Sequence, residues 1–175
     1  MNETTKTSSE TIVEISLDGE KISALEGSTI LDVCKQANID TPTLCWAENL
    51  TPVNVCRVCV VEVEGSRALV PSCSRPIEEG MVVSTKSEKV NTSRRMVLEL
   101  LASSVELDRA DKEILEWMNH YGSNPERMGN SNEIKTSKQP VKIEDNLYVR
   151  DYERCILCYK CVEACGDEAQ HTFAI

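Results

Sequence analysis

The sequence predicts an α+β fold. Its first part contains segments in which apolar and polar residues alternate, one helical segment and further short strands. A stretch of helical periodicity follows. Residues 11–17 alternate apolar and polar side chains, and the Asp-Gly pair at positions 18 and 19 supplies the turn of a β-hairpin continued by residues 21–25. The apolar residues of segment 29–39 recur at helical spacing, so one helix is expected to cross the sheet.

Ser28 is the expected N-cap of that helix, because serine favours the position just before the first helical turn. Further strands, punctuated by glycine and proline, are expected over residues 58–63, 68–70 and 81–84. Hairpin, helix and strands together form one compact unit over residues 11–87, a length typical of a small domain.

Helical periodicity dominates after residue 87. Segment 92–102 is a predicted helix, and so is segment 108–120, with Asp108 as its cap. Its apolar residues on one side are Ile114, Leu115, Trp117 and Met118. Residues 121–140 are rich in Gly, Ser, Asn, Pro and charge, which predicts a linker. The expected organisation is a disordered N-terminus over 1–10, a first domain over 11–87, a helical connector and linker over 88–140, and a last domain over 141–175.

Composition narrows the class of protein. The 175 residues include 19 basic and 29 acidic side chains, a net charge of −10, which makes nucleic acid an unlikely partner. The first ten residues lack the apolar segment of a secretory signal, and the longest apolar run, residues 58–61, is too short to span a membrane. A cytoplasmic protein without direct membrane insertion is therefore expected. In that compartment nine cysteines indicate metal ligands or redox centres more than disulfides.

The first cysteine group consists of Cys45, Cys56, Cys59 and Cys73, one close pair flanked by two distant single residues. Structural zinc sites usually have two close pairs, so this spacing fits zinc poorly. A [2Fe-2S] cluster needs two thiolates on each iron, and a loop can deliver three while a neighbouring strand delivers the fourth. Arg57 and the amides of that loop are expected to direct N–H groups at the cluster. The alternative is four buried thiols without a metal.

The second group, Cys155, Cys158, Cys161 and Cys165, has the spacing C-x2-C-x2-C-x3-C, which serves [4Fe-4S] clusters in bacterial ferredoxins. A zinc site built from one short continuous loop would be strained. In two-cluster ferredoxins the fourth cysteine belongs to the other cluster, and no cysteine follows Cys165 here. We expect the chain to be a fragment of a longer polypeptide. A ligand from a partner, or Cys165 folding back onto the same cubane, are the alternatives.

Several motifs resemble the N-terminal iron–sulfur region shared by the large iron–sulfur subunit of respiratory complex I, [FeFe]-hydrogenases and NAD-dependent formate dehydrogenases. They are Pro42-Thr-Leu-Cys45-Trp, Cys56-Arg-Val-Cys59-Val-Val-Glu-Val-Glu-Gly65, Pro71-Ser-Cys73, Glu79-Gly-Met-Val-Val-Ser-Thr85 and Arg94-Arg-Met-Val-Leu-Glu-Leu-Leu101. The resemblance implies a β-grasp ferredoxin domain whose [2Fe-2S] cluster is held by the first cysteine group. It also implies that Cys155, Cys158 and Cys161 hold a [4Fe-4S] cluster in a partial bacterial-type ferredoxin domain, while Cys165 begins the ligand set of a second. Val55 departs from the glycine usual in these relatives, and its side chain is expected to crowd the loop.

The relatives commonly carry a middle [4Fe-4S] cluster held by one His and three Cys after the first domain. Residues 102–112 contain neither Cys nor His, so this cluster is expected to be absent. Its loss would lengthen the electron path between the two cysteine groups, unless the helices bring them together. His120 has no thiol companion and is expected at the surface. The ninth cysteine, Cys34, is expected to be a small core residue.

These features predict an electron-transfer protein, because clusters held only by cysteine carry electrons and do little chemistry of their own. The chain has no P-loop, no dinucleotide-binding glycine motif and only two histidines, so no catalytic site is expected in it. The resemblance implies a flavin- and NAD-binding partner subunit and a unit that reacts with formate, hydrogen or quinone. The alternatives from other classes are a zinc-stabilised interaction protein and an iron–sulfur redox sensor.

Overall fold

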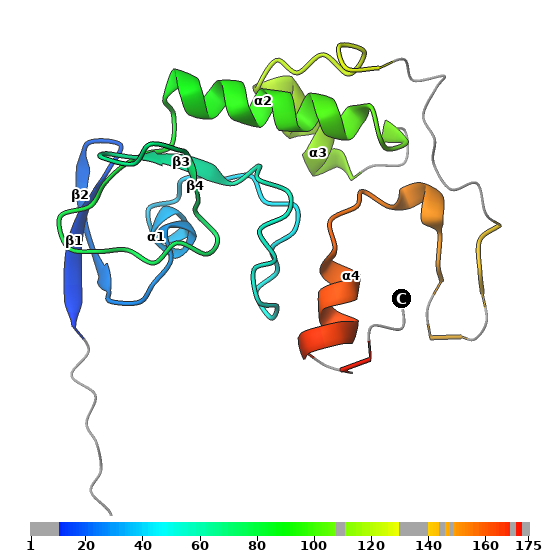
Figure 1. The fold of residues 1–175 in the computed structure, drawn as a ribbon, viewed down its shortest axis with the longest axis horizontal. Coiled ribbons are helices and arrows are strands. Elements are labelled where there is room, and N and C mark those ends of the chain that lie inside the picture. Colours follow the sequence, from blue (N-terminus) through cyan, green and yellow to red (C-terminus); the bar gives the residue numbers. More distant parts are fainter. Residues whose placement is uncertain are drawn as a thin grey trace, which may run out of the picture.

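The computed structural model describes residues 11–107, 111–129, 140–143, 146–147, 149–168 and 171–172. The predicted disordered N-terminus and most of the second half of the predicted linker lie outside these residues, as does the predicted helix cap Asp108. A mixed β-sheet, crossed by one helix, forms one end of the molecule. Two further helices lie along one side of the molecule, and a short helix lies at its other end (Figure 1).

A β-hairpin opens the fold, as the alternation predicts. Strand β1 (Ile12–Leu17) pairs antiparallel with β2 (Glu20–Leu25), from Ile12 opposite Leu25 to Leu17 opposite Glu20. Both turn residues have positive φ, 51° at Asp18 and 92° at Gly19, which is the conformation of a two-residue turn that matches the strand twist. The Asp18 carboxylate also accepts hydrogen bonds from the amide and the hydroxyl of Thr85, tying the turn to the last strand.

Three short strands complete a five-stranded sheet with the order β2-β1-β5-β3-β4. They are β3 (Val60–Val63), β4 (Val70–Pro71) and β5 (Val82–Ser84). β5 lies parallel to β1, and its pairing with β3 and that of β3 with β4 are antiparallel. β3 begins two residues later than predicted, because residues 58 and 59 belong to the cysteine loop. This topology is the β-grasp arrangement, and it confirms the predicted fold class.

Helix α1 (Ile30–Gln36) packs across the sheet and is capped by Thr29, not by Ser28 as predicted. The Thr29 side chain accepts from the Asp32 amide, and the Asp32 carboxylate accepts from the Thr29 amide, which together form a capping box. Ser28 instead belongs to the turn after β2, where its amide donates to the Leu25 carbonyl. Cys34 is fully buried in the core between α1 and the sheet, where the sequence places it.

Helices α2 (Glu88–Ala102) and α3 (Lys112–His120) pack against each other on one side of the sheet (Figure 1). α2 begins four residues earlier than predicted, because Ser87 caps it by accepting from the Val90 amide. α3 begins after Asp111, which occupies the N-cap position. Leu115 is 42% exposed and does not join the buried side of α3, contrary to the prediction.

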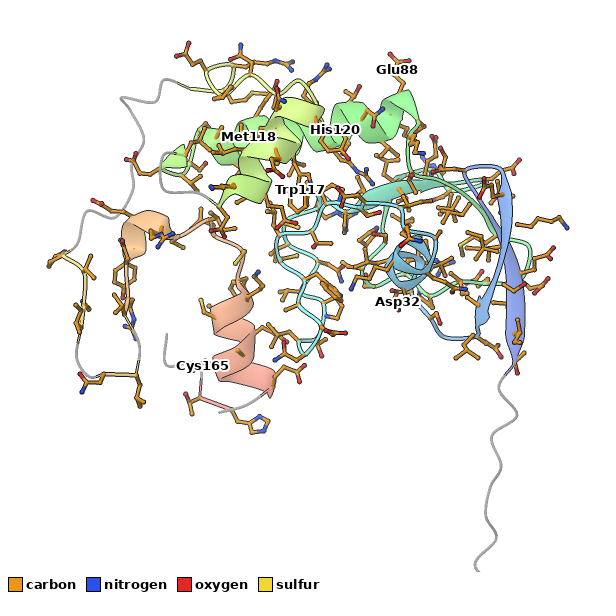
Figure 2. The ribbon with its side chains drawn as sticks, turned by 180° about the vertical axis from the view of Figure 1, so that it is seen from behind. Asp32, Glu88, Trp117, Met118, His120 and Cys165 are labelled. Atoms are coloured by element: carbon orange, nitrogen blue, oxygen red, sulfur yellow. The ribbon has the colours of Figure 1, made fainter. Side chains whose placement is uncertain are left out.

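A second core joins these helices to the first cysteine loop and is distinct from the core between α1 and the sheet. Its buried members are Leu44, Val58, Leu98, Ala102, Ile114, Trp117 and Met118. Figure 2 shows Trp117 and Met118 on the α3 side of this region. Because Leu44 and Val58 come from the loop, α2 and α3 pack against that loop as well as against the sheet.

The last segment contains a short antiparallel bridge between Lys142 and Arg150, a 3-10 turn over Tyr152–Arg154, and helix α4 (Lys160–Glu163) followed by a π-helical turn, Ala164–Glu168. α4 lies on the far side of the cysteine loop from α1 (Figure 1). None of the described helices has the length and apolar character needed to cross a membrane.

Candidate metal centre

The loop that carries Cys45, Cys56 and Cys59 is fixed by backbone conformation and by one asparagine. Asn54 and Arg57 have positive φ values, 61° and 57°, which turn the chain sharply on either side of Cys56. The Asn54 side-chain carbonyl accepts from the Ser74 hydroxyl at 2.7 Å, and its amide donates to the Pro52 carbonyl at 3.2 Å. Asn54 therefore ties the loop to the segment that carries Cys73.

Cys59 and Cys73 form one thiol pair. Their sulfur atoms are 3.4 Å apart and both residues are buried. That separation is far longer than the roughly 2.05 Å of a disulfide. It is close to the roughly 3.8 Å between two thiolates on one tetrahedral metal with metal–sulfur bonds of about 2.3 Å. The neighbouring Ser72 hydroxyl donates to the Cys59 carbonyl at 2.8 Å, which holds the two chain segments together.

Cys45 and Cys56 form the other pair. A hydrogen bond from the Cys45 thiol lowers the pKa of Cys56 to about 5, although burial opposes this shift. Backbone N–H groups, among them that of Val58, also favour the Cys56 thiolate. The same thiol contact, together with burial, raises the pKa of Cys45. The predicted supply of N–H groups from this loop is therefore present, although the Arg57 side chain itself is exposed.

The contact between the two thiols shifts their pKa values in opposite directions in the Cys59–Cys73 pair as well. The contact with Cys73 lowers the pKa of Cys59 to about 6, and it raises the pKa of Cys73. In each pair the contact thus favours the thiolate form of one sulfur and the thiol form of the other. A metal that binds both sulfurs displaces the remaining proton, so loading of the site releases protons.

Two thiol pairs suit a two-iron cluster, in which each iron takes two protein thiolates. Among the described residues, no three or more His, Cys, Asp or Glu side chains surround one point that a single metal ion could fill. The two thiol pairs of the first group fit the [2Fe-2S] cluster that the spacing predicts.

Trp46 is a residue of this site that the spacing of the cysteines does not reveal. It packs against Leu31, Cys59 and Cys73, and the Lys35 ammonium lies 3.5 Å from its ring centre. Its position next to Cys45 in the sequence is the only signal that could have indicated it. The predicted crowding by Val55 is not seen, because this side chain is 50% exposed and lines a surface cavity.

The second cysteine group is less buried. Cys155 and Cys161 are exposed, whereas Cys158 and Cys165 are partly buried. Leu157 and Tyr159 have positive φ, so the chain turns on both sides of Cys158 before α4 begins. Cys165, labelled in Figure 2, lies about one helical turn beyond Cys161, and its sulfur is 3.5 Å from the Thr172 hydroxyl. Four cysteines within one loop and its following helix offer the donor set of a cubane.

The fold brings the two cysteine groups together. Cys56 and Cys158 line the same cavity of about 320 Å³, and Ile156 packs against the second core beside Cys56. Glu168, at the end of the π-helical turn, accepts hydrogen bonds from the amide and the hydroxyl of Thr51, and these bonds lower the pKa of its carboxyl group. The Ile156 packing and the Thr51–Glu168 hydrogen bonds thus hold the second cysteine loop beside the first. His120 is exposed and stacks edge-on against Tyr121, as expected of a surface histidine.

Comparison with known families agrees with these two centres. Residues 10–88 match the 2Fe-2S iron-sulfur cluster binding domain, and residues 148–170 match the 4Fe-4S binding domain. These two matches confirm both predicted cofactors, a [2Fe-2S] cluster and a [4Fe-4S] cluster.

Three curated relatives are similar in sequence to most of this chain. It is 37% identical over 167 residues to the NADP-reducing hydrogenase subunit HndD of Solidesulfovibrio fructosivorans, covering 89% of this chain and 28% of that one. It is 31% identical over 158 residues to the NADPH-Fe(3+) oxidoreductase subunit alpha of Geobacter sulfurreducens, covering 87% of this chain and 18% of the relative. The mitochondrial NADH-ubiquinone oxidoreductase 78 kDa subunit of Candida albicans is 33% identical over 165 residues, 90% of this chain and 22% of its own. The chain spans less than a third of the length of these relatives.

The solved structures include an NAD+-reducing [NiFe]-hydrogenase in the H2-reduced state, which matches with a TM-score of 0.70 and 29% sequence identity. The match covers 90% of this chain and 68% of the other. Together these relatives confirm the resemblance to hydrogenases and to the complex I subunit that the motifs indicate. The resemblance to formate dehydrogenases stays a prediction.

Proposed function

We propose that this chain passes single electrons between two iron–sulfur centres inside an NAD(P)-linked oxidoreductase complex. The observation that carries this proposal is the meeting of the two cysteine groups at one cavity, since Cys56 and Cys158 both line it. Clusters held there would supply one-electron redox chemistry, and the protein would set their position, hydrogen bonding and exposure.

The thiol pairs support a specific ligand assignment. Cys45 and Cys56 would hold one iron of the [2Fe-2S] cluster, and Cys59 and Cys73 the other, because these are the sulfurs in contact. Cys155, Cys158 and Cys161 would hold the [4Fe-4S] cluster. Cys165, less than one and a half helical turns from Cys161, is placed to close the same cubane or to serve a second one.

Residues of this chain would lie along the electron path between the two proposed clusters. Ile156 and Leu44 pack in one core with Cys56, so apolar side chains connect the two groups beside the surface cavity that Cys56 and Cys158 line. Thr51 and Glu168 join the two loops at another point. We infer that the chain needs no middle cluster for transfer within it, and that its domain division is the one that the sequence predicts.

The partners are proposed by similarity. A flavin- and NAD(P)-binding subunit would stand on one side, and a unit that reacts with hydrogen, quinone or formate on the other, so that this chain works as a component of a larger complex. The net charge of −10 favours docking onto basic surfaces of such partners. We also propose a cytoplasmic location, where the thiols remain reduced before the clusters are inserted.

The test is anaerobic purification, followed by iron and acid-labile sulfide analysis and electron paramagnetic resonance of the reduced protein. The [2Fe-2S] signal is expected to vanish in Cys56→Ser and in Cys59→Ser and to survive in Cys158→Ser. Cys34→Ala serves as the matched control, because it changes a buried thiol outside both groups and should keep the signal. A colourless protein loaded with zinc would contradict the proposal and favour an interaction module.

A further inference from the structure

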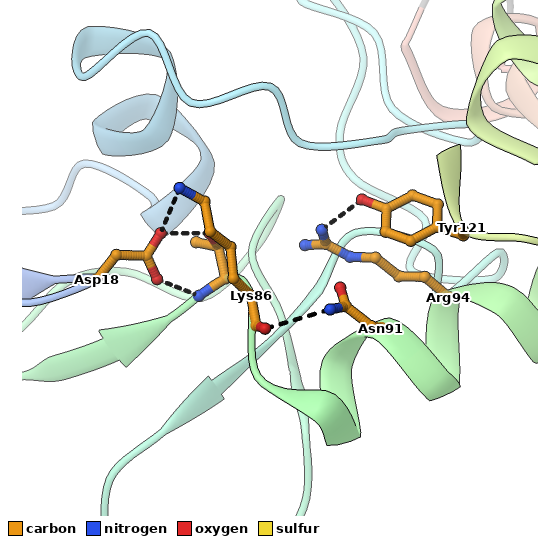
Figure 3. A network of polar contacts seen from close by, with 6 residues as sticks. Asp18, Lys86, Asn91, Arg94 and Tyr121 are labelled. Atoms are coloured by element: carbon orange, nitrogen blue, oxygen red, sulfur yellow. Dashed lines mark hydrogen bonds and ion pairs between the residues drawn. The ribbon is translucent and has the colours of Figure 1, made fainter. Parts of the chain in front are cut away.

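Arg94 is a buried cation on the face of α2 that packs against β3. It is 2% exposed. One guanidinium nitrogen donates to the Tyr121 hydroxyl at 2.8 Å, as Figure 3 shows, and another donates to the Val60 carbonyl at 3.1 Å. Its Nε atom is buried without a hydrogen-bond partner.

Both hydrogen-bond partners of Arg94 are neutral. Within the described residues no carboxylate lies at ion-pair distance from its guanidinium, whereas Glu99, on the same helix, is buried in an ion pair with Arg127. An arginine is always charged in proteins, and burying a charge without an opposite charge nearby is costly. A negative group close to Arg94 would offset that cost.

Two sources of negative charge lie near Arg94, namely Asp40, which lines a cavity with it, and the first cysteine group. Val60, whose carbonyl receives the Arg94 hydrogen bond, directly follows Cys59. One turn further along α2, Leu98 packs in the core that contains Leu44, Val58 and Cys56. Burial raises the pKa of the Cys34 thiol in the neighbouring core, and a hydrogen bond with Thr41 and, to a smaller extent, the charge of Arg94 oppose the rise.

We propose that Arg94 is a positioning residue that tunes the reduction potential of the [2Fe-2S] cluster by placing an unscreened positive charge beside it. The inference rests on the proposed function. Reduction adds one electron, and therefore one negative charge, to a cluster that is already negative through its four thiolates. A fixed buried cation stabilises the reduced form more than the oxidised form, because little water intervenes to screen it. Arg94 would thus raise the potential.

The experiment is a redox titration of the full-length protein, following the [2Fe-2S] signal by electron paramagnetic resonance. Arg94→Met removes the charge and keeps an apolar chain of similar reach. We expect the ratio of reduced to oxidised cluster at a fixed potential to fall about tenfold, a shift of about 59 mV for a one-electron couple. Arg94→Lys keeps the charge and should shift the ratio by less than about threefold.

Lys89→Met is the matched control, because it removes a positive charge from the same helix at a position where the side chain is 50% exposed and solvent screens it. It should leave the potential near that of the native protein. The [4Fe-4S] potential in the same sample should also stay unchanged in Arg94→Met.

An unchanged [2Fe-2S] potential in Arg94→Met would overturn the inference, and so would an equal shift in Lys89→Met. If Arg94→Met does not hold the cluster, Arg94→Gln, which keeps a donor for the Val60 carbonyl, must show the same tenfold change. Failure of both variants to hold the cluster would also overturn it, because Arg94 would then serve assembly of the site. Absence of the signal from the native protein would contradict the proposed function itself.

Discussion

The two cysteine groups of this chain have opposite surroundings. Cys45, Cys59 and Cys73 are at most 2% exposed, and they are held by a sheet, by α1 and by the core under α2. Cys155 and Cys161 are exposed, and they lie on a turn and a four-residue helix. Four helical residues cannot form a stable helix on their own in water.

The difference indicates two ways of building a metal centre. At the first group, packing of apolar side chains holds the cysteines in pairs. At the second group the chain supplies ligands but few buried contacts, so cluster binding must contribute most of the free energy that orders the loop. The first centre is therefore part of the fold, whereas the fold of the second depends on its centre.

Removal of iron should give the largest effect and separate the two regions. In protein treated anaerobically with a reductant and an iron chelator, we expect amide protection over residues 155–168 to fall by more than about 100-fold, because metal binding supplies the local folding free energy there. Amides of β1 and β3 should change by less than about tenfold. Hydrogen exchange measured by mass spectrometry checks both. Comparable losses in the two regions would contradict the distinction.

A truncation in the second core should show how strongly packing holds the first cysteine loop. Leu98 is fully buried against Leu44 and Val58, so Leu98→Ala should lower the free energy of unfolding by about 2–5 kcal/mol through lost contacts and a cavity. Leu100→Ala, on the exposed side of the same helix, should cost less than about 1 kcal/mol. Denaturant unfolding measures both. Equal costs would show that this core does not support the loop.

A smaller effect is expected at the contact between the two loops. Glu168→Gln weakens acceptance of the hydrogen bonds from Thr51, so exchange of the Thr51 amide should accelerate roughly two- to tenfold, in line with the modest net value of a single hydrogen bond. Glu48→Gln changes an exposed carboxylate on the same cysteine loop and should leave that rate unchanged. Amide exchange followed by nuclear magnetic resonance distinguishes the two variants, and equal rates would argue against a docked last segment.

The sequence predicted local features where one short segment decides the outcome. The hairpin at residues 18 and 19 is correct because the Asp-Gly pair tolerates positive φ, and the cofactors are correct because the thiol spacings are specific. The helix caps were less predictable. Ser28 and Thr29 are both good capping residues, and only the reciprocal bond with Asp32 selects Thr29. The ligand assignment of each cysteine stays a prediction.

The amino-acid sequence by itself determined which atoms are available to bind iron, because thiol spacing and turn chemistry depend on neighbours along the chain. Only the tertiary structure decided which sulfurs form pairs, that Cys56 and Cys158 share a cavity, and that Arg94 lies buried beside the segment after Cys59. These relations join residues up to about a hundred positions apart. They arise from the packing of α2 and α3 on the cysteine loop, which no local pattern encodes.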